Sequence, residues 1–236
     1  MTASALTLGY VPGATPAKWA RIWAQRHPGI PLRLRAVSAA DAAAEVRAGG
    51  VDVALLRPSA DTAALALIPL YEETTVAVVP TDHLLSAADE VALADLDGEP
   101  VLLPLDDVVA WADAPGVPVD HRPETTAAAT ELVAAGLGLL IVPRSLARLH
   151  HRRDLTYRPI AGAPGCPVAL AFADGRQSTL IEDFVGIVRG RRPGSSRGQD
   201  QPQPKRTARE KTLAKQAARA AAGKVARKPG RAGRGR

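Results

Sequence analysis

The stretch from residue 125 to residue 145, TTAAATELVAAGLGLLIVPRS, constrains the fold of this chain more than any other. It opens with two threonines, either of which can cap a helix because its side-chain oxygen accepts an unpaired backbone N–H. Leu132 and Val133 give that helix an apolar face, and Gly136 permits the left-handed turn that ends it. Residues 137–142 are too apolar and too few for an exposed helix, which predicts a covered strand ending at a proline. The N–H groups at the helix start also form a candidate anion site.

Composition restricts the class of protein further. Hydrophobic residues make up 46% of the 236 residues, but only eight are aromatic, so the core must consist of Ala, Val and Leu. No run approaches the roughly 20 apolar residues of a membrane-spanning helix, and the N-terminus lacks the basic start and apolar segment of a signal peptide. A single cysteine excludes an internal disulfide framework. We expect a cytoplasmic protein without membrane attachment.

Charge divides the chain into two unlike parts. Residues 1–190 carry 15 Lys and Arg against 22 Asp and Glu, whereas residues 191–236 carry 15 against 2. Gly, Ser, Pro, Gln, Arg and Lys dominate the second part, which has nothing to bury in a core. We therefore expect a folded body over residues 1–190 and a disordered, Lys/Arg/Ala-rich tail over 191–236.

The first 56 residues alternate strand and helix patterns. Apolar strands are expected over residues 6–11, 32–37 and 51–56, with a helix after Thr15 and another after Ser38. This order is typical of an α/β fold with mainly parallel sheets. Further strand and helix patterns continue to residue 190 and fit two lobes. Lobe I is expected at about 1–79 and 161–190, and lobe II at about 80–160.

Five segments together resemble the substrate-binding (effector-binding) domain of LysR-type transcriptional regulators, in the family's order over residues 6–190. The segments are LTLGY at residue 6, HPGI at residue 27, GGVDVAL at residue 49, LYEE to VPTDHLL at residues 70–85, and VAAGLGLLIVP at residue 133. The last is similar to the family pattern V-x-x-G-x-G-I-x-x-L-P. The resemblance implies a two-lobed fold like that of type 2 periplasmic binding proteins, with a ligand between the lobes.

The same resemblance carries expectations about function. It implies a small-molecule effector, a part in transcription regulation, and a homodimer that uses the first helix, where Trp19 and Trp23 either pack on the sheet or contribute to the dimer surface. Family members begin with a winged helix-turn-helix, whereas residue 6 here already lies in the sensor domain. A separate DNA-binding partner encoded nearby is therefore one expectation. The segment from 104 to 117 is also shorter than is usual in the family.

The family's ligand-contacting positions fall on strand ends and helix starts of this chain, where α/β sheets bind ligands. The candidate residues are Pro12, Gly13, Ala14, Thr15, Ser38, Arg57, Glu124, Thr125 and Thr126. Two helix starts facing one cleft favour a small organic anion. Each Ser or Thr can equally be a plain helix cap, and Arg57 can instead pair with an acid on the surface.

Other kinds of chemistry find little support in the sequence. No P-loop, G-x-S-x-G or H-E-x-x-H motif is present, and the five histidines lack metal-ligand spacing, so we expect neither metal nor cofactor. Cys166 has no base beside it in the sequence and is expected to be inert. We expect no enzyme. The alternative is a biosynthetic enzyme on the same fold, for which Glu124 is the one plausible catalytic group.

The basic tail provides a second functional hypothesis. Its charge favours phosphate binding that weakens as salt rises, and it lacks aromatic residues for base stacking, so binding would be independent of nucleic-acid sequence. The candidate contacts are Lys205, Arg206, Lys211, Lys215, Arg219, Lys224, Arg227 and Lys228. Two alternatives stay open: the tail only solubilises the chain, or it is the working part and the body merely dimerises it.

Overall fold

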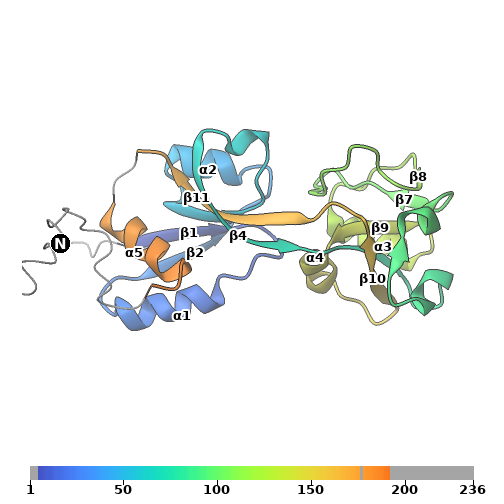
Figure 1. The fold of residues 1–236 in the computed structure, drawn as a ribbon, viewed down its shortest axis with the longest axis horizontal. Helices are drawn as coiled ribbons and strands as arrows, with labels where there is room; N and C mark the ends of the chain where they lie inside the picture. The colour runs from blue at the N-terminus through green and yellow to red at the C-terminus, as the bar shows by residue number, and fades with distance from the viewer. Residues whose placement is uncertain (1–4, 176–177, 192–236) are drawn as a thin grey trace, which may run out of the picture. The chain divides into compact units, whose positions relative to one another are not determined.

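The computed structural model describes residues 5–175 and 178–191. The tail candidates, from Lys205 to Lys228, lie outside the described residues. Two sheets organise the described part, and Figure 1 shows them as two lobes joined by two chain segments. Among the described residues, no helix has the length and apolar character needed to span a bilayer.

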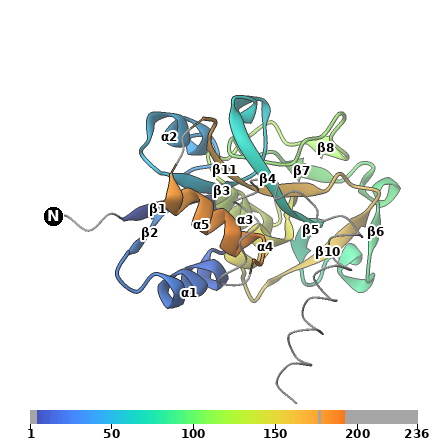
Figure 2. The ribbon, with the colours of Figure 1, turned by 60° about the vertical axis from the view of Figure 1, so that its left-hand side comes forward.

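Lobe I is built on a five-stranded sheet. Its strands, in spatial order, are β2 (Leu32–Ala36), β1 (Leu6–Tyr10), β3 (Val53–Leu56), β11 (Cys166–Ala173) and β4 (Leu65–Glu73). Helices α1 (Ala17–Arg26) and α5 (Thr179–Val188) lie side by side on one face of this sheet, and α2 (Ala42–Ala48) lies on the other (Figure 1 and Figure 2). A short 3-10 turn, η1 (Ala60–Thr62), precedes β4.

Lobe II is built on a six-stranded sheet. Its strands, in spatial order, are β6 (Val91–Ala92), β10 (Leu155–Ala161), β5 (Thr75–Pro80), β9 (Leu139–Pro143), β7 (Pro100–Leu102) and β8 (Val117–Pro118). The remaining elements of this lobe are α3 (Thr126–Ala134), α4 (Arg144–Leu149), η2 (Leu84–Ala87) and η3 (Leu93–Leu96). Both faces of the sheet are covered, since separate apolar clusters pack on each side of β5 and β9.

The sheets are mixed rather than purely parallel. β1 pairs in parallel with β2 and β3, whereas β11 is antiparallel to β3 and β4, and β5 is antiparallel to β9 and β10. The antiparallel pairs all involve strands next to the two crossings between lobes. A chain that leaves a lobe and later returns to it must enter the sheet in the opposite direction.

The first lobe boundary differs from the expected one near residue 79. β5 pairs with β9 and β10 in the second sheet, so the chain crosses at Thr74, directly after β4. The return crossing follows Ala161, and the chain enters lobe I at Cys166. The expected boundary is too late because β4 and β5 both have the pattern of an apolar strand. Such a pattern does not indicate which strands a given strand pairs with.

The stretch from 125 to 145 folds as expected. Thr125 caps α3, because its hydroxyl accepts the Ala128 N–H at 3.1 Å. Gly136 adopts φ +77°, and Gly138, at φ +155°, approaches so closely that a Cβ there would lie 2.7 Å from the Pro100 carbonyl oxygen. β9 then runs fully buried from Leu139 to Pro143. Glycine at 138 is thus required by the packing of β9 against β7.

The two tryptophans of α1 pack mainly in the core of lobe I. Trp23 is buried, stacks on His27 and donates its indole N–H to the Ile30 carbonyl at 2.8 Å. Trp19 is partly buried and packs against the same cluster. Packing on the lobe I core is therefore what Trp23 does, while Trp19 retains some exposed surface.

Candidate ligand cleft

One cavity of about 680 Å³ is lined by residues of both lobes. Lobe I contributes the loop after β1, the end of β2 and the end of β4, and lobe II contributes only α4. The lining residues are Tyr10, Pro12, Gly13, Ala14, Thr15, Ala36, Tyr71, Glu72, Glu73, Arg144, Ser145, Arg148 and Leu149. Its volume is within the usual range of small-molecule sites.

The loop after β1 forms the part of the cleft that sequence reasoning located. Pro12, Gly13, Ala14 and Thr15 all line the cavity. Gly13 has φ +83°, and a Cβ at this position would collide with the Ser145 hydroxyl of lobe II. The glycine therefore allows the two lobes to approach at the cleft. Helix α1 starts one residue later than expected, with Pro16 at its N-cap and no side-chain capping bond.

Helix α4 forms the opposite wall and was missed as a functional element. It starts directly after Pro143, and the Arg144 N–H donates to the Thr74 carbonyl at 2.9 Å, which anchors its start to the first crossing. Arg144, Ser145 and Arg148 then face the cavity. The available signal was an Arg-Ser pair placed immediately after a buried strand, where α/β sheets expose their ligand-binding edge.

Arg57 lies beside the cavity and joins three parts of the protein. Its guanidinium donates to the Pro12 carbonyl at 3.0 Å, to the Glu73 carboxylate at 2.7 Å and to the Ser145 hydroxyl at 3.1 Å. Pro12 follows β1 in lobe I, Glu73 ends β4 just before the first crossing, and Ser145 belongs to lobe II. Arg57 does pair with an acid, as one interpretation of the sequence holds, but this acid is only partly exposed and lies at the end of β4.

The Arg57–Glu73 pair is the most desolvated ion pair described. Only 6% of the Arg57 side chain and 11% of the Glu73 side chain are exposed. The Arg57 Nε has no hydrogen-bond partner within the described part of the chain. Removing one member of such a pair leaves an uncompensated buried charge, which is strongly destabilising. All three groups that accept from Arg57 belong to residues that line the cavity.

Tyr71 supplies a phenol to the same cavity. Burial raises the pKa of this tyrosine, the nearby Glu73 carboxylate raises it further, and the Arg57 guanidinium opposes the rise. The phenol is therefore neutral at physiological pH and can donate a hydrogen bond to a ligand. Tyr10 adds a second ring to the lobe I wall.

The start of α3 does not line the cavity, in contrast to the expectation for Glu124, Thr125 and Thr126. The backbone N–H and the hydroxyl of Thr126 both donate to one oxygen of Asp106, at 2.7 and 2.9 Å. These donors at the helix start therefore bind a carboxylate of the chain itself. Glu124 is exposed and lies outside the cavity lining.

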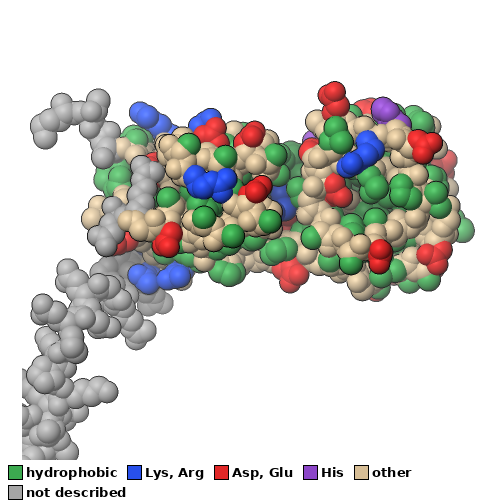
Figure 3. All heavy atoms as spheres, turned by 90° about the horizontal axis from the view of Figure 1, so that it is seen from above, with side chains coloured by type: hydrophobic (Ala, Val, Ile, Leu, Met, Phe, Trp, Pro, Cys, Tyr) green, Lys and Arg blue, Asp and Glu red, His purple; other side chains and the backbone are tan. Residues whose placement is uncertain are grey.

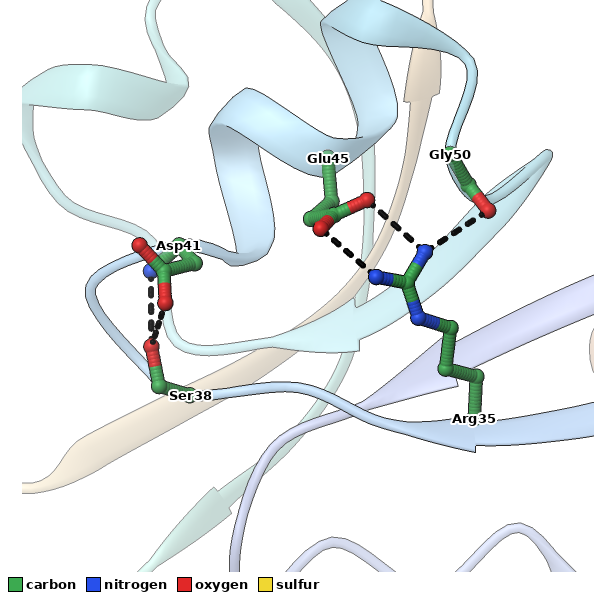
Figure 4. Close-up of polar contacts among 5 residues, drawn as sticks. All are labelled: Arg35, Ser38, Asp41, Glu45 and Gly50. Carbon is green, nitrogen blue, oxygen red and sulfur yellow. Dashed lines mark hydrogen bonds and ion pairs between the residues drawn. The ribbon is translucent and has the colours of Figure 1, made fainter.

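Ser38 also has a structural role and does not line the cavity, although the neighbouring Ala36 does. Its hydroxyl accepts the Asp41 N–H at 3.0 Å and donates to the Asp41 carboxylate at 2.7 Å, which closes the turn before α2 (Figure 4). In the same view Arg35 binds Glu45 through two hydrogen bonds and the Gly50 carbonyl through a third. These contacts fix α2 against β2.

Cys166 lies where the chain re-enters lobe I. It is buried, its sulfur is 3.5 Å from the Thr75 hydroxyl, and burial raises the pKa of its thiol. A protonated, enclosed thiol is a poor nucleophile. In residues 5–175 and 178–191 no cluster of three or more His, Cys, Asp or Glu side chains is arranged to hold a metal ion.

Two α/β lobes with a cavity between them are the architecture of the type 2 periplasmic-binding-protein fold. Residues 4–193 match the family of the LysR substrate binding domain. The chain therefore belongs to this family, and it is an effector-binding domain of the LysR type.

The curated relatives are transcriptional regulators rather than enzymes. The chain is 28% identical over 201 residues to the Hca operon transcriptional activator HcaR of Escherichia coli, covering 79% of this chain and 67% of the relative. It is 30% identical over 203 residues to a probable hydrogen peroxide-inducible genes activator of Mycobacterium avium, covering 78% of this chain and 64% of the relative. The chain thus spans about two thirds of the length of these regulators.

Solved structures agree on the fold. The reduced form of OxyR superposes with a TM-score of 0.67 at 22% identity, covering 81% of this chain and 97% of that one. The BenM effector-binding domain with its effector benzoate gives a TM-score of 0.64 at 20% identity, covering 79% and 91%. The two-lobed α/β fold expected from the sequence is confirmed.

Proposed function

We propose that this protein binds a small organic anion in the cleft between its lobes and thereby takes part in transcription regulation. The observation that carries the proposal is the cavity of about 680 Å³ lined by the loop at residues 12–15 on one side and by the basic α4 on the other. Its lining combines apolar side chains, two phenols and two arginines, a mixture typical of small-molecule sites. One BenM structure contains the carboxylate benzoate as its effector.

The charges around the cavity favour an anion. Glu73 is neutralised by Arg57, and Glu72 is the remaining acidic lining residue, against Arg144 and Arg148. Pro12, Gly13, Ala14 and Thr15 remain proposed ligand contacts, and Thr15 offers a hydroxyl next to the start of α1. Arg57 is proposed to act from behind the lining, by holding Pro12 and Ser145 in place. For Ser38, Glu124, Thr125 and Thr126, a direct contact has no support from the cavity lining.

Thermal shift of the full chain against a library of small carboxylates and phosphates, including benzoate, tests the proposal. We expect several compounds to raise the melting temperature, because a ligand that binds only the folded state stabilises it. Thr15→Trp should abolish these shifts by filling the cleft from an exposed position. Ala24→Trp, on the exposed side of α1, is the matched control. Shifts that survive Thr15→Trp would place binding elsewhere.

Homodimer formation is a further part of the proposal. Its support is the partly exposed Trp19 on α1 and the exposed Leu34 on the edge strand β2, both in lobe I. Light scattering coupled to size exclusion should give twice the mass of the chain, and Leu34→Glu should reduce it. A monomer at all concentrations would count against a dimer. A separate DNA-binding partner remains a proposal that an inspection of neighbouring genes tests.

The basic tail supports a second candidate activity, non-specific binding of nucleic acid. Its support is the excess of 15 Lys and Arg over 2 Asp and Glu in residues 191–236. Retention of duplex DNA should fall steeply as salt rises from about 50 to 200 mM and disappear when residues 191–236 are deleted. Retention that is unchanged by the deletion would contradict this role. A cytoplasmic location is part of the same proposal.

A further inference from the structure

The lobe II wall of the cleft is basic and has no acidic partner of its own. Arg144 and Arg148 both line the cavity and are both exposed. Within residues 5–175 and 178–191, neither guanidinium is in an ion pair, and the side-chain hydrogen bond recorded for this pair is from the Arg148 Nε to the Tyr157 hydroxyl at 3.1 Å. The face drawn in Figure 3 is hollowed where the lobes meet, and Lys or Arg atoms are visible there.

The two arginines are placed to act together. They are four residues apart on α4, so they lie on the same side of the helix, with Cβ atoms about 5–6 Å apart. Without a bound ligand, two like charges at this spacing on a helix repel each other and are mildly destabilising. An anion between them removes that repulsion, and each planar guanidinium can donate two parallel hydrogen bonds to a carboxylate or phosphate.

The opposite wall limits where a ligand can carry its negative charge. Glu73 is already paired with Arg57, but Glu72 is exposed and has no ion-pair partner in the described part of the chain. The Glu72 carboxylate packs over Gly165 at the return crossing, where a Cβ would collide with it. A second anionic group on the lobe I side would be repelled by Glu72. The charge of the ligand must therefore be concentrated at the α4 end.

From this arrangement we propose that Arg144 and Arg148 select a ligand with a doubly charged anionic head. The chemical class is a compact dianion: a phosphate group, or two carboxylates on adjacent atoms, with the rest of the molecule lying against Tyr10 and Tyr71. The inference rests on the proposed function, because it names the ligand class of the same cleft. It differs from the expectation drawn from sequence, in which two helix starts, those of α1 and α3, face the cleft and bind the anion.

Matched pairs of probes test this selectivity in the full chain at constant ionic strength. Phthalate is compared with benzoate and succinate with acetate, and inorganic phosphate is a fifth probe, all by calorimetric titration. We expect phthalate to bind at least about tenfold more tightly than benzoate, because its second carboxylate adds charge-assisted hydrogen bonds to the two arginines. Arg144→Gln or Arg148→Gln should remove most of that preference.

Arg33→Gln is the matched control, because Arg33 is exposed on β2 and does not line the cavity. It should leave both affinities unchanged, which separates cleft binding from general attraction to the basic tail. Equal affinity for both members of each pair, a preference that survives both α4 substitutions, or failure of every probe to bind would each overturn the inference. The proposed function is judged separately by the compound library and the cleft-filling Thr15→Trp variant.

Discussion

Helix α3 directly precedes the buried strand β9 in the chain and helix α4 directly follows it, yet the donor groups of the two helices have different partners. At α3 the anion site is closed from within, because Asp106 accepts both the N–H and the hydroxyl of Thr126. At α4 two arginines face the cavity without an acidic partner in the described residues. The difference indicates which site is structural and which is available to a ligand.

The Arg57 cluster lies between these extremes and gives the largest expected effect. Glu73→Leu leaves the Arg57 guanidinium buried without its carboxylate, and breaking such a pair costs about 3–5 kcal/mol. Urea unfolding should show this loss. The double variant Arg57→Met/Glu73→Leu should recover much of it, since no unpaired charge remains. A single variant as stable as the parent would mean that water already solvates Arg57.

Asp106→Ala tests the difference between α3 and α4 directly, because it removes the carboxylate that binds the Thr126 donors at the start of α3. We expect a loss of about 1–2 kcal/mol in the free energy of unfolding, because a helix start loses its carboxylate partner. Inorganic phosphate should then stabilise the variant more than the parent. Asp113→Ala is the matched control, because it removes an exposed carboxylate that accepts no hydrogen bond from the residues that the structure describes. If phosphate stabilises all three proteins equally, the α3 start is not an anion site.

Thr125→Ala sharpens the comparison, because it weakens the same helix start without opening it. The substitution removes the hydroxyl that accepts the Ala128 N–H at 3.1 Å, and loss of such a cap costs about 1 kcal/mol. Asp106 still occupies the Thr126 donors, so phosphate should give this variant no added stability. Unfolding in urea with and without phosphate measures both effects. An added phosphate response would show that Asp106 does not close the site.

The sequence predicted the elements of this region better than their surroundings. The α3 cap, the turn at Gly136 and the buried β9 each depend on residues that are close together in the sequence. The loop at residues 12–15 was also predicted, because it directly follows a strand end. Such features need no knowledge of what lies across the fold.

Contacts between distant segments were not predictable in the same way. Asp106 reaches Thr126 from 20 positions away, and Arg57 reaches Ser145 from 88 positions away. β5 joins the second sheet because of its partners β9 and β10, which its own apolar pattern does not identify. Whether the N–H groups at a helix start already bind a side chain of the protein thus depends on a distant residue, which local sequence patterns do not identify.

Arg144→Gln/Arg148→Gln gives the smallest expected effect on stability and completes the comparison. Exposed side chains without an ion-pair partner contribute little to folding, so the free energy of unfolding should stay within about 0.5 kcal/mol of the parent. Removing two like charges one turn apart offsets part of the loss of the hydrogen bond from Arg148 to the Tyr157 hydroxyl. A loss comparable to that of Asp106→Ala would show that α4 is held by its arginines, and the basic wall would then be structural as well.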